Sequence, residues 1–161
     1  MTVPLSEQPS KSYLPSLYEE DFYLWLQATT KLLQQRELAQ LDLENLIEEL
    51  ESMGRREKRE VKNPLMILIE HLLKLQYWEA EKQQNARGWR NTVIEQQRQL
   101  ELSLEDSPSL KNVLADSFLD CYQKSRQDTI RKYELPSEIF PVEPPFTLAE
   151  VISSSDKGNR E

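Results

Sequence analysis

The chain has 161 residues, enough for one ordinary domain with a buried hydrophobic core. It contains only three glycines and is rich in Leu, Glu, Gln, Arg and Lys, the residue types that favour helices. The formal net charge of −8 repels a phosphate backbone and so disfavours nucleic acid as a ligand. The composition therefore predicts an all-α, single-domain bundle of about five helices with an extended C-terminal tail.

Membrane insertion and secretion are both disfavoured by the sequence. The longest apolar run, residues 65–69, is too short to cross a bilayer, and the first residues lack the basic start and apolar stretch of a secretory signal. Cys121 is the only cysteine, so an internal disulfide and a cysteine-rich zinc site are excluded. We expect a cytoplasmic protein without membrane association, bound cofactor or metal.

The first predicted helix begins at Ser16. Residues 1–15 contain three prolines and several serines, which is typical of a flexible lead-in. Ser16 and Glu19 have the spacing of a capping box. The expected buried face, at helical spacing, consists of Tyr18, Phe22, Trp25, Leu26, Thr29, Leu32 and Leu33.

The second predicted helix begins after Asp42, a good N-cap, and we expect Leu41 to pack against Leu46. Gly54 is expected to end it, because glycine accepts the left-handed terminal conformation. Residues 55–62 then hold five basic and two acidic residues. We interpret this segment as a solvated, salt-bridged helix face, with a local nucleic-acid patch as the less favoured reading.

The next helix is predicted from Leu65 to about Gln83. Whether Pro64 breaks, kinks or starts a helix is left open by the sequence. Gly88 is expected to separate this helix from a fourth one, over residues 89–104.

A fifth helix is predicted after Ser107 and Pro108, as cap and first helical residue. Its expected core face consists of Leu110, Val113, Leu114, Phe118, Cys121 and Tyr122. Residues 16–135 would then form the bundle, followed by a Pro-rich tail over 136–161 with one last short turn capped by Thr147 and Glu150 and a disordered end.

One polar stripe stands out on the helix after Pro64. His71 and Lys74 lie between Ile67 and Trp78 at spacings of four, three and four, so partial burial is expected. Burial of such groups is costly without partners, and the acidic second helix offers carboxylates. A hairpin turning near residues 59–60 would place His71 opposite Glu48, whereas a turn at residue 54 would lose that register.

If the helix is instead continuous, His71 and Glu48 are ~34 Å apart along its axis. A His71–Lys74–carboxylate cluster is suited to binding an anion or a metal, or to acid–base chemistry. The competing interpretation, which we favour, is a structural contact between helices, with the Lys74 stem lying along Trp78. A second mixed stripe, Arg90, Ile94, Arg98 and Glu101, is typical of an ion-paired helix surface.

Several catalytic and metal-binding motifs are missing from the sequence. It has no Gly-rich phosphate loop, no Glu-x-x-His pair and no His-Asp doublet. A single histidine also excludes a multi-histidine metal site within one chain.

Three segments together resemble a known bacterial family. The segments are Tyr-Glu-Glu-Asp-Phe-Tyr-Leu-Trp at 18–25, Leu-Asp-Leu-Glu-Asn-Leu-Ile-Glu-Glu-Leu-Glu-Ser-Met-Gly at 41–54, and His-Leu-Leu-Lys at 71–74. The chain is similar over residues 17–146 to domain of unknown function twenty-nine, a largely cyanobacterial family. The resemblance implies a helical fold and no established activity. It directs attention to His71, Lys74, Asp42, Glu48 and Glu51.

Two functions follow as hypotheses. The first is a non-catalytic helical interaction module, which binds a protein partner or forms a homo-oligomer. The second is a small-ligand-binding protein or enzyme, with His71, Lys74 and Glu48 as candidate catalytic residues. Asp42, Glu51 and Arg98 are the candidate ligand-binding residues in that case. The absence of known catalytic motifs favours the first hypothesis, the non-catalytic module.

Overall fold

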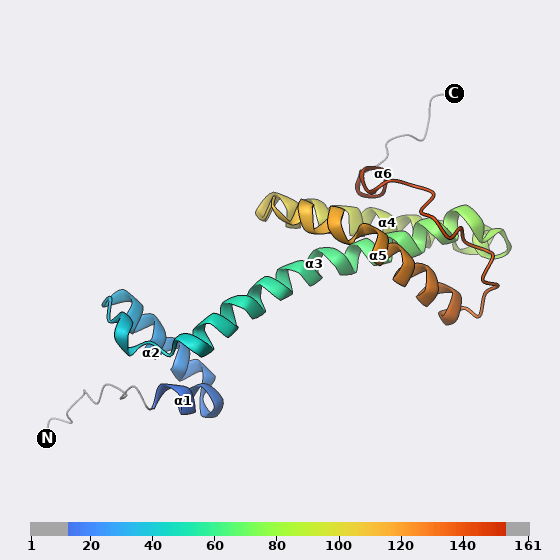
Figure 1. Cartoon of the computed structure of the whole chain (residues 1–161). Coiled ribbons are helices and arrows are strands. Elements are labelled where there is room, and N and C mark those ends of the chain that lie inside the picture. The colour runs from blue at the N-terminus through green and yellow to red at the C-terminus, as the bar shows by residue number, and fades with distance from the viewer. Residues whose placement is uncertain (1–12, 154–161) are drawn as a thin grey trace, which may run out of the picture. The chain divides into compact units, whose positions relative to one another are not determined.

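The computed structural model describes residues 13–153, and in this range the chain is built from helices, with a long extended connection over residues 133–147 before the last one (Figure 1). They are α1 (Leu14–Glu20), α2 (Phe22–Gln34), the 3-10 helix η1 (Leu38–Gln40), α3 (Leu43–Tyr77), α4 (Glu79–Asp106), α5 (Leu110–Lys132) and α6 (Leu148–Ile152). The described range contains no strand, which confirms the all-α class. None of its helices is long and apolar enough to cross a membrane. The predictions for residues 1–12 and 154–161 lie outside the described residues.

The chain divides into two compact units within α3. Unit 1 ends at Arg55 and unit 2 begins at Arg56. This division falls inside the predicted bundle of residues 16–135, whose limits stay a prediction. Each unit has a hydrophobic core of its own.

Unit 1 is built around Trp25, which is fully buried between α1, α2 and the start of α3. The other buried members of its core are Leu14, Leu17, Leu32 and Leu41. Leu41 is a member of this core and Leu46 packs against it, so both residues of the predicted contact lie at the same core. The indole Nε1 of Trp25 donates to the Asp42 carboxylate at 3.2 Å, and this bond ties α2 to the residue before α3.

The predicted start of the first helix is wrong. The helix breaks at Asp21, whose side chain accepts a hydrogen bond from the Leu24 N–H at 3.0 Å and so caps α2. Ser16 lies inside α1 and donates to the Tyr13 carbonyl oxygen instead of forming a capping box with Glu19. Asp21 is favoured here because an aspartate at the N-cap satisfies an otherwise unpaired backbone N–H.

The predicted buried face of this region is only partly correct. Trp25, Thr29 and Leu32 are buried. The prediction is wrong for three apolar residues of α2, which are 39–44% exposed: Phe22, Leu26 and Leu33. The core of unit 1 is small and covers only the strip of α2 around Trp25.

Helix α3 is continuous from Leu43 to Tyr77, so the predicted helix end at Gly54 is wrong. A glycine inside a helix lowers its stability by about 1 kcal/mol relative to alanine, an effect that a helix of this length tolerates. Pro64 also lies inside α3 and is buried. It removes one backbone hydrogen bond, but its ring adds apolar surface to unit 2.

The chain turns back after α3 at Trp78, whereas the sequence predicted a separation of two helices at Gly88. Helix α3 ends at Tyr77 and α4 starts at Glu79, so the predicted helices over 65–83 and 89–104 have wrong bounds. The Trp78 ring stacks on Trp89, with centroids 5.8 Å apart, and packs against Tyr133 at 5.1 Å. These aromatic contacts join residues far apart in the sequence and stabilise the turn, which has no Gly or Pro from which it could be predicted.

Unit 2 has the larger core, which α3, α4, α5 and α6 share. Its buried members include Leu65, Leu68, Ile69, Leu73, Leu100, Leu114, Cys121, Tyr122, Phe140 and Val151. The predicted core face of α5 is confirmed, with Val113 and Phe118 partly buried and the remainder buried. Helix α5 starts at Leu110 after Ser109, two residues later than predicted from Ser107.

The Pro-rich segment after α5 packs on unit 2. Phe140 and Val151 are buried in the core, and the Tyr122 hydroxyl donates to the Pro141 carbonyl oxygen at 2.6 Å. The predicted capping box of Thr147 and Glu150 is present and starts α6. Side-chain donors thus satisfy backbone carbonyls of a segment that has little regular structure of its own.

Candidate functional site

Lys74 is the centre of a buried polar cluster in unit 2. Its side chain belongs to α3, where only 2% of the residue is exposed. The ammonium Nζ lies 3.0 Å from Glu70 Oε1 and donates to the Tyr133 hydroxyl at 3.2 Å. It also lies over two aromatic rings, 5.1 Å from the centroid of Trp89 and 4.9 Å from that of Tyr133. Hydrogen bonds and cation–π contacts therefore stabilise this buried charge without a ligand.

Glu70 balances the charge of this cluster. Burial alone would raise the pKa of its carboxyl, but the hydrogen bond from Lys74 and the charges of Lys74 and Lys132 lower it below the ordinary value. Glu70 Oε1 also accepts from the Tyr133 hydroxyl at 3.2 Å, and Lys132 Nζ lies 3.5 Å away. The carboxylate is thus ionised and fully engaged within unit 2.

His71 is half-buried next to this cluster and has a different partner. Its Nδ1 lies 2.8 Å from the Ile67 carbonyl oxygen, the geometry of a ring N–H that donates within the helix. Burial lowers the pKa of the ring, and the positive charges of Lys74 and Lys132 lower it further, whereas the Ile67 hydrogen bond and Glu70 oppose this shift. The imidazole is therefore neutral at pH 7.

The predicted cluster of His71, Lys74 and Glu48 is divided between the two units. Helix α3 has no turn at residue 54 or at 59–60, so the continuous helix is the correct alternative and the hairpin is wrong. Glu48 belongs to unit 1, where its carboxylate pairs with Arg55 at 2.6 Å. The acidic partner of Lys74 is Glu70, one turn earlier on the same helix.

The three candidate ligand-binding residues belong to different units, Asp42 and Glu51 to unit 1 and Arg98 to unit 2. Asp42 accepts hydrogen bonds from Trp25 and, at 2.7 Å, from the Asn45 amide. Glu51 is exposed and lies 4.0 Å from Arg55. Arg98 lies on the exposed side of α4. None of the salt bridges within residues 13–153 involves Arg90, Arg98 or Glu101, so the ion pairing of this stripe stays a prediction.

Three residues of the Lys74 cluster were missed by the sequence interpretation. Glu70 had a local signal, because it lies four positions before Lys74 and such pairs meet on a helix surface. Trp89 and Tyr133 come from α4 and from the end of α5, so only the tertiary fold brings them to Lys74. No spacing rule connects residues 74, 89 and 133.

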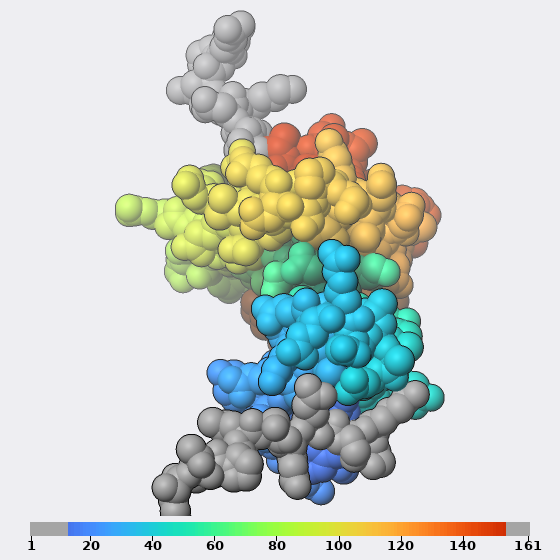
Figure 2. Space-filling model, turned by 90° about the vertical axis from the view of Figure 1, so that its left-hand side faces the viewer, coloured from blue at the N-terminus to red at the C-terminus, as the bar shows by residue number. Residues whose placement is uncertain are grey.

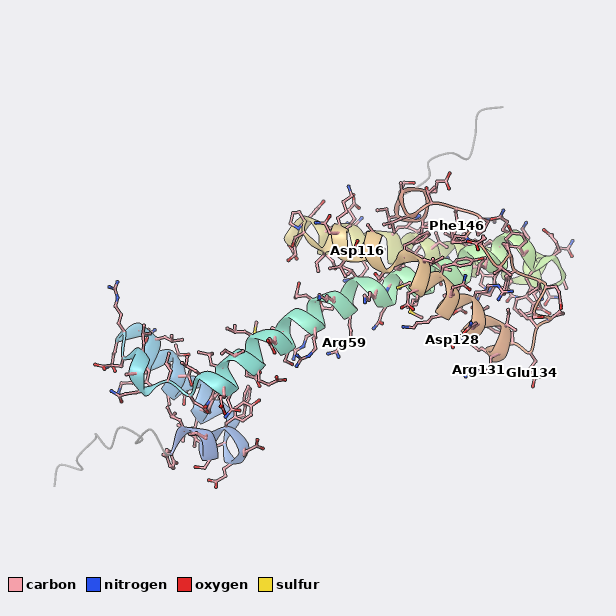
Figure 3. The ribbon with its side chains drawn as sticks, viewed as in Figure 1. Arg59, Asp116, Asp128, Arg131, Glu134 and Phe146 are labelled. Carbon is pink, nitrogen blue, oxygen red and sulfur yellow. The ribbon has the colours of Figure 1, made fainter. Side chains whose placement is uncertain are left out.

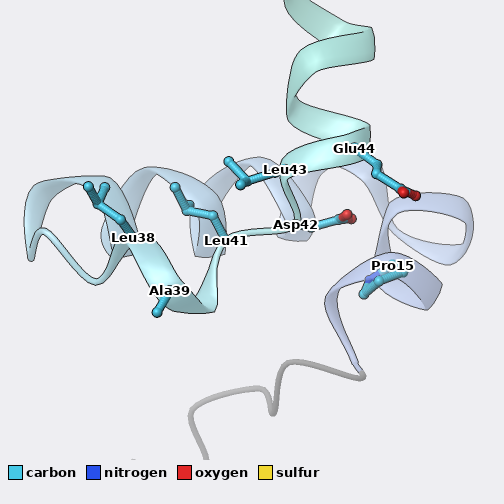
Figure 4. Close-up of a pocket in the computed structure, with 7 residues that line it drawn as sticks. All are labelled: Pro15, Leu38, Ala39, Leu41, Asp42, Leu43 and Glu44. Atoms are coloured by element: carbon cyan, nitrogen blue, oxygen red, sulfur yellow. The ribbon is translucent and has the colours of Figure 1, made fainter.

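The described range offers no metal site at the Lys74 cluster. Residues 13–153 contain no group of three His, Cys, Asp or Glu side chains that could hold a metal ion. A surface hollow of about 410 Å³ lies in unit 1 instead (Figure 4). It is lined by Pro15, Leu38, Ala39, Leu41, Asp42, Leu43 and Glu44. Most of its lining is apolar, with two carboxylates from the start of α3.

Exposed apolar side chains are concentrated in unit 1. Of the fifteen large hydrophobic residues that are exposed in the described range, eleven belong to unit 1: Tyr13, Phe22, Tyr23, Leu24, Leu26, Leu33, Leu38, Leu43, Ile47, Leu50 and Met53. Four of these follow one another on α3 and are here called the α3 stripe: Leu43, Ile47, Leu50 and Met53, which are 52–60% exposed. The segment around η1, near residue 40, also lies at the surface in the space-filling view (Figure 2).

Unit 1 also carries most of the negative charge. Residues 13–55 hold nine acidic and three basic side chains, a net charge of −6 out of the −8 of the whole chain. Glu44 and Glu51 lie three positions before and four positions after Ile47, so they flank the α3 stripe on one side. We call this pair of exposed carboxylates the acidic rim.

The basic segment at 55–62 follows the stripe on α3. Its residues up to Glu60 are exposed, and Arg59 projects away from the helix (Figure 3). Arg55 pairs with Glu48 and Glu51, which agrees with a salt-bridged, solvated helix face at this end of the segment. The exposed pair of Asp128 and Arg131 on α5 is of the same kind (Figure 3).

The comparisons with known proteins identify a family but no activity. Searches of curated proteins and of solved structures each gave no match. The model of the family described as domain of unknown function DUF29 matches residues 17–155. This match covers most of the chain and confirms the resemblance of its three sequence segments. The chain therefore belongs to the DUF29 family.

Proposed function

We propose that this protein is a non-catalytic helical module that binds another protein through unit 1. The proposal rests on the concentration of exposed apolar side chains between Tyr13 and Met53. Scattered surface leucines are common in globular proteins, whereas a dense group of large apolar side chains rimmed by charge is typical of an interaction site. The α3 stripe is the most regular part of this group.

The enzyme or small-ligand alternative receives less support. Lys74 and Glu70 are engaged with each other and with Tyr133, and Lys74 is 2% exposed. A substrate would have to displace aromatic contacts to reach the ammonium group. The close packing supports a structural role for this cluster in unit 2.

The proposal is tested by quantitative affinity capture from the cells that produce the protein. The informative variant is Ile47→Gln with Leu50→Gln, because both side chains are more than half exposed and their loss should leave the fold intact. A matched control is Ile94→Gln with Leu102→Gln, two exposed apolar residues of α4. We expect a defined partner to be captured by the wild type and by the control but lost from the stripe variant.

Two results would refute the proposal. One is that the wild type captures no defined partner. The other is equal capture of the same partner by all three forms, which would place binding away from the α3 stripe. Circular dichroism of each variant confirms that the helical content is unchanged before capture is compared.

A further inference from the structure

We infer that the partner of unit 1 presents a basic amphipathic helix, which lies along the α3 stripe with its positive side chains at the acidic rim. The inference rests on the proposed function and adds the chemistry of the partner. It follows from three observations: the spacing of the stripe, the charge around it, and the hollow at its end.

The spacing of the stripe favours a helical partner. Leu43, Ile47 and Leu50 are separated by four and three positions, so they lie on one side of α3. Ridges with this spacing pack against the equivalent ridges of a second helix. The described residues offer no strand edge to which an extended peptide could be added, and a helix laid along α3 is a common recognition mode that this spacing fits.

The charge around the stripe favours a basic partner. Glu44 and Glu51 are exposed beside Ile47, and Arg55 lies 4.0 Å from the Glu51 carboxylate. With Arg55 included, residues 13–55 still have a net charge of −6. Opposite charges across an interface increase the association rate and select the partner, and like charges exclude the wrong one. Lys or Arg side chains flanking the apolar face of the partner would meet the acidic rim.

The same charges disfavour a second copy of this chain as the partner. An antiparallel copy that placed its Leu50 opposite Ile47 would bring its Glu51 close to Glu44. Two acidic rims would then face each other in an interface whose two sides both carry a net charge of −6. Like-charge pairs of this kind oppose self-association along the α3 stripe.

The surface hollow supplies an anchor point at one end of the stripe. Leu43 belongs to both the stripe and the hollow, and Leu38 and Leu41 form apolar lining beside it (Figure 4). Asp42 and Glu44 provide carboxylates at the same place. A long side chain with an apolar stem and a positive end, such as Lys or Arg, combines the two chemistries that this hollow offers.

The experiment uses two synthetic amphipathic helices of about 18 residues, long enough to lie along the stripe. Both peptides carry Leu on one face, and the opposite face carries Lys in one peptide and Glu in the other. Binding of each labelled peptide to the full-length protein is followed by fluorescence anisotropy at several salt concentrations. We expect the Leu/Lys peptide to bind, with an affinity that falls as salt rises, and the Leu/Glu peptide not to bind.

A charge-reversal variant separates rim recognition from general attraction to an acidic protein. Glu44→Lys with Glu51→Lys should weaken Leu/Lys binding about tenfold and allow the Leu/Glu peptide to bind. The matched control is Glu101→Lys with Glu105→Lys, which changes the total charge equally but lies on exposed positions of α4 in unit 2. This control should retain most of the wild-type affinity. If the rim variant folds poorly, Glu44→Gln with Glu51→Gln gives the same comparison with a smaller effect.

Several outcomes would overturn the inference. These are failure of the Leu/Lys peptide to bind the wild type, equal binding of both peptides, and equal weakening by the rim variant and the control. The proposed function can still stand in each case. It stands if lysate capture identifies a partner that depends on Ile47 and Leu50 but contacts them with a segment that is neither helical nor basic. If the Leu/Lys peptide does not bind and lysate capture also finds no partner that depends on Ile47 and Leu50, the proposed function is refuted as well.

Discussion

At the scale of single residues, Lys74 shows how a charged side chain can be buried in a helical core. Burial of an ammonium group is unfavourable unless charge and hydrogen bonds compensate for lost water. Glu70, Tyr133 and the ring of Trp89 provide that compensation. The sequence correctly marked Lys74 as a residue that needs a partner. It indicated the wrong carboxylate, because the partner lies on the same helix and the helix does not fold back.

Replacing Lys74 should destabilise the protein strongly. Lys74→Met leaves the Glu70 carboxylate without its main partner, and we expect the free energy of unfolding to fall by about 3 kcal/mol. Lys124→Met is the matched control, since Lys124 forms an exposed pair with Asp120 at the same i,i+4 spacing. That change should alter the stability by at most about 0.5 kcal/mol. Urea titration of both variants measures the difference, and equal midpoints would contradict a structural role for Lys74.

His71 should make the stability of the protein depend on pH. The pKa of the folded-state ring lies below its ordinary value of 6.5, mainly because of burial, so the unfolded chain binds a proton more readily. The stabilising contribution is complete above pH 6.5 and is lost as the pH falls through that value towards the folded-state pKa. In His71→Gln the unfolding free energy should vary less between about pH 7.5 and 5.5. If the unfolding free energy of His71→Gln varied with pH as much as that of the wild type, His71 would not be the source of the pH dependence.

At the scale of helices, one local capping signal was confirmed, those at Ser16, Gly54 and Ser107 were wrong, and tertiary contacts determine the turn at Trp78. The box of Thr147 and Glu150 starts α6 as predicted. Near the N-terminus two signals competed, and Asp21 prevailed over Ser16. The turn at Trp78 could not be predicted, because Trp and Glu are ordinary helix residues and the turn depends on packing against Trp89 and Tyr133.

The two glycines inside helices provide a direct test of the helix bounds. An added Cβ at Gly54 or at Gly88 would meet no other atom within 4 Å, and neither residue has a positive φ. Gly54→Ala and Gly88→Ala should therefore each stabilise the protein by about 0.5–1 kcal/mol. Thermal unfolding monitored by circular dichroism measures the shift. A loss of stability in either variant would indicate a left-handed helix end at that position, as the sequence alone had suggested for Gly54.

At the scale of the whole molecule, the two units differ in how they treat apolar residues. Unit 2 buries them, and even its Pro-rich segment contributes Phe140 and Val151 to the core. Unit 1 leaves eleven large apolar side chains exposed around a small core. Helical periodicity predicted which residues are apolar on one side of a helix. Periodicity could not predict which apolar helix faces stay exposed to solvent, because that depends on which other segments of the chain pack against each face.

The segment after α5 should contribute to the stability of unit 2. Phe140 is 1% exposed and its ring lies 6.4 Å from that of Tyr77, so Phe140→Ala should lower the unfolding free energy by about 3–5 kcal/mol. Val142 is 63% exposed in the same segment, and Val142→Ala should have almost no effect. Chemical denaturation of both variants makes the comparison. A negligible effect of Phe140→Ala would show that this segment does not form part of the core in solution.

Native mass spectrometry of the protein, purified gently from the cells that produce it, shows whether unit 1 binds a protein partner through the α3 stripe. We expect a defined complex of the chain with a second protein, and the mass of the chain alone when Ile47 and Leu50 are both replaced by Gln. Detection of only the chain itself in the wild type, or of an unchanged complex in the variant, would refute the proposed function.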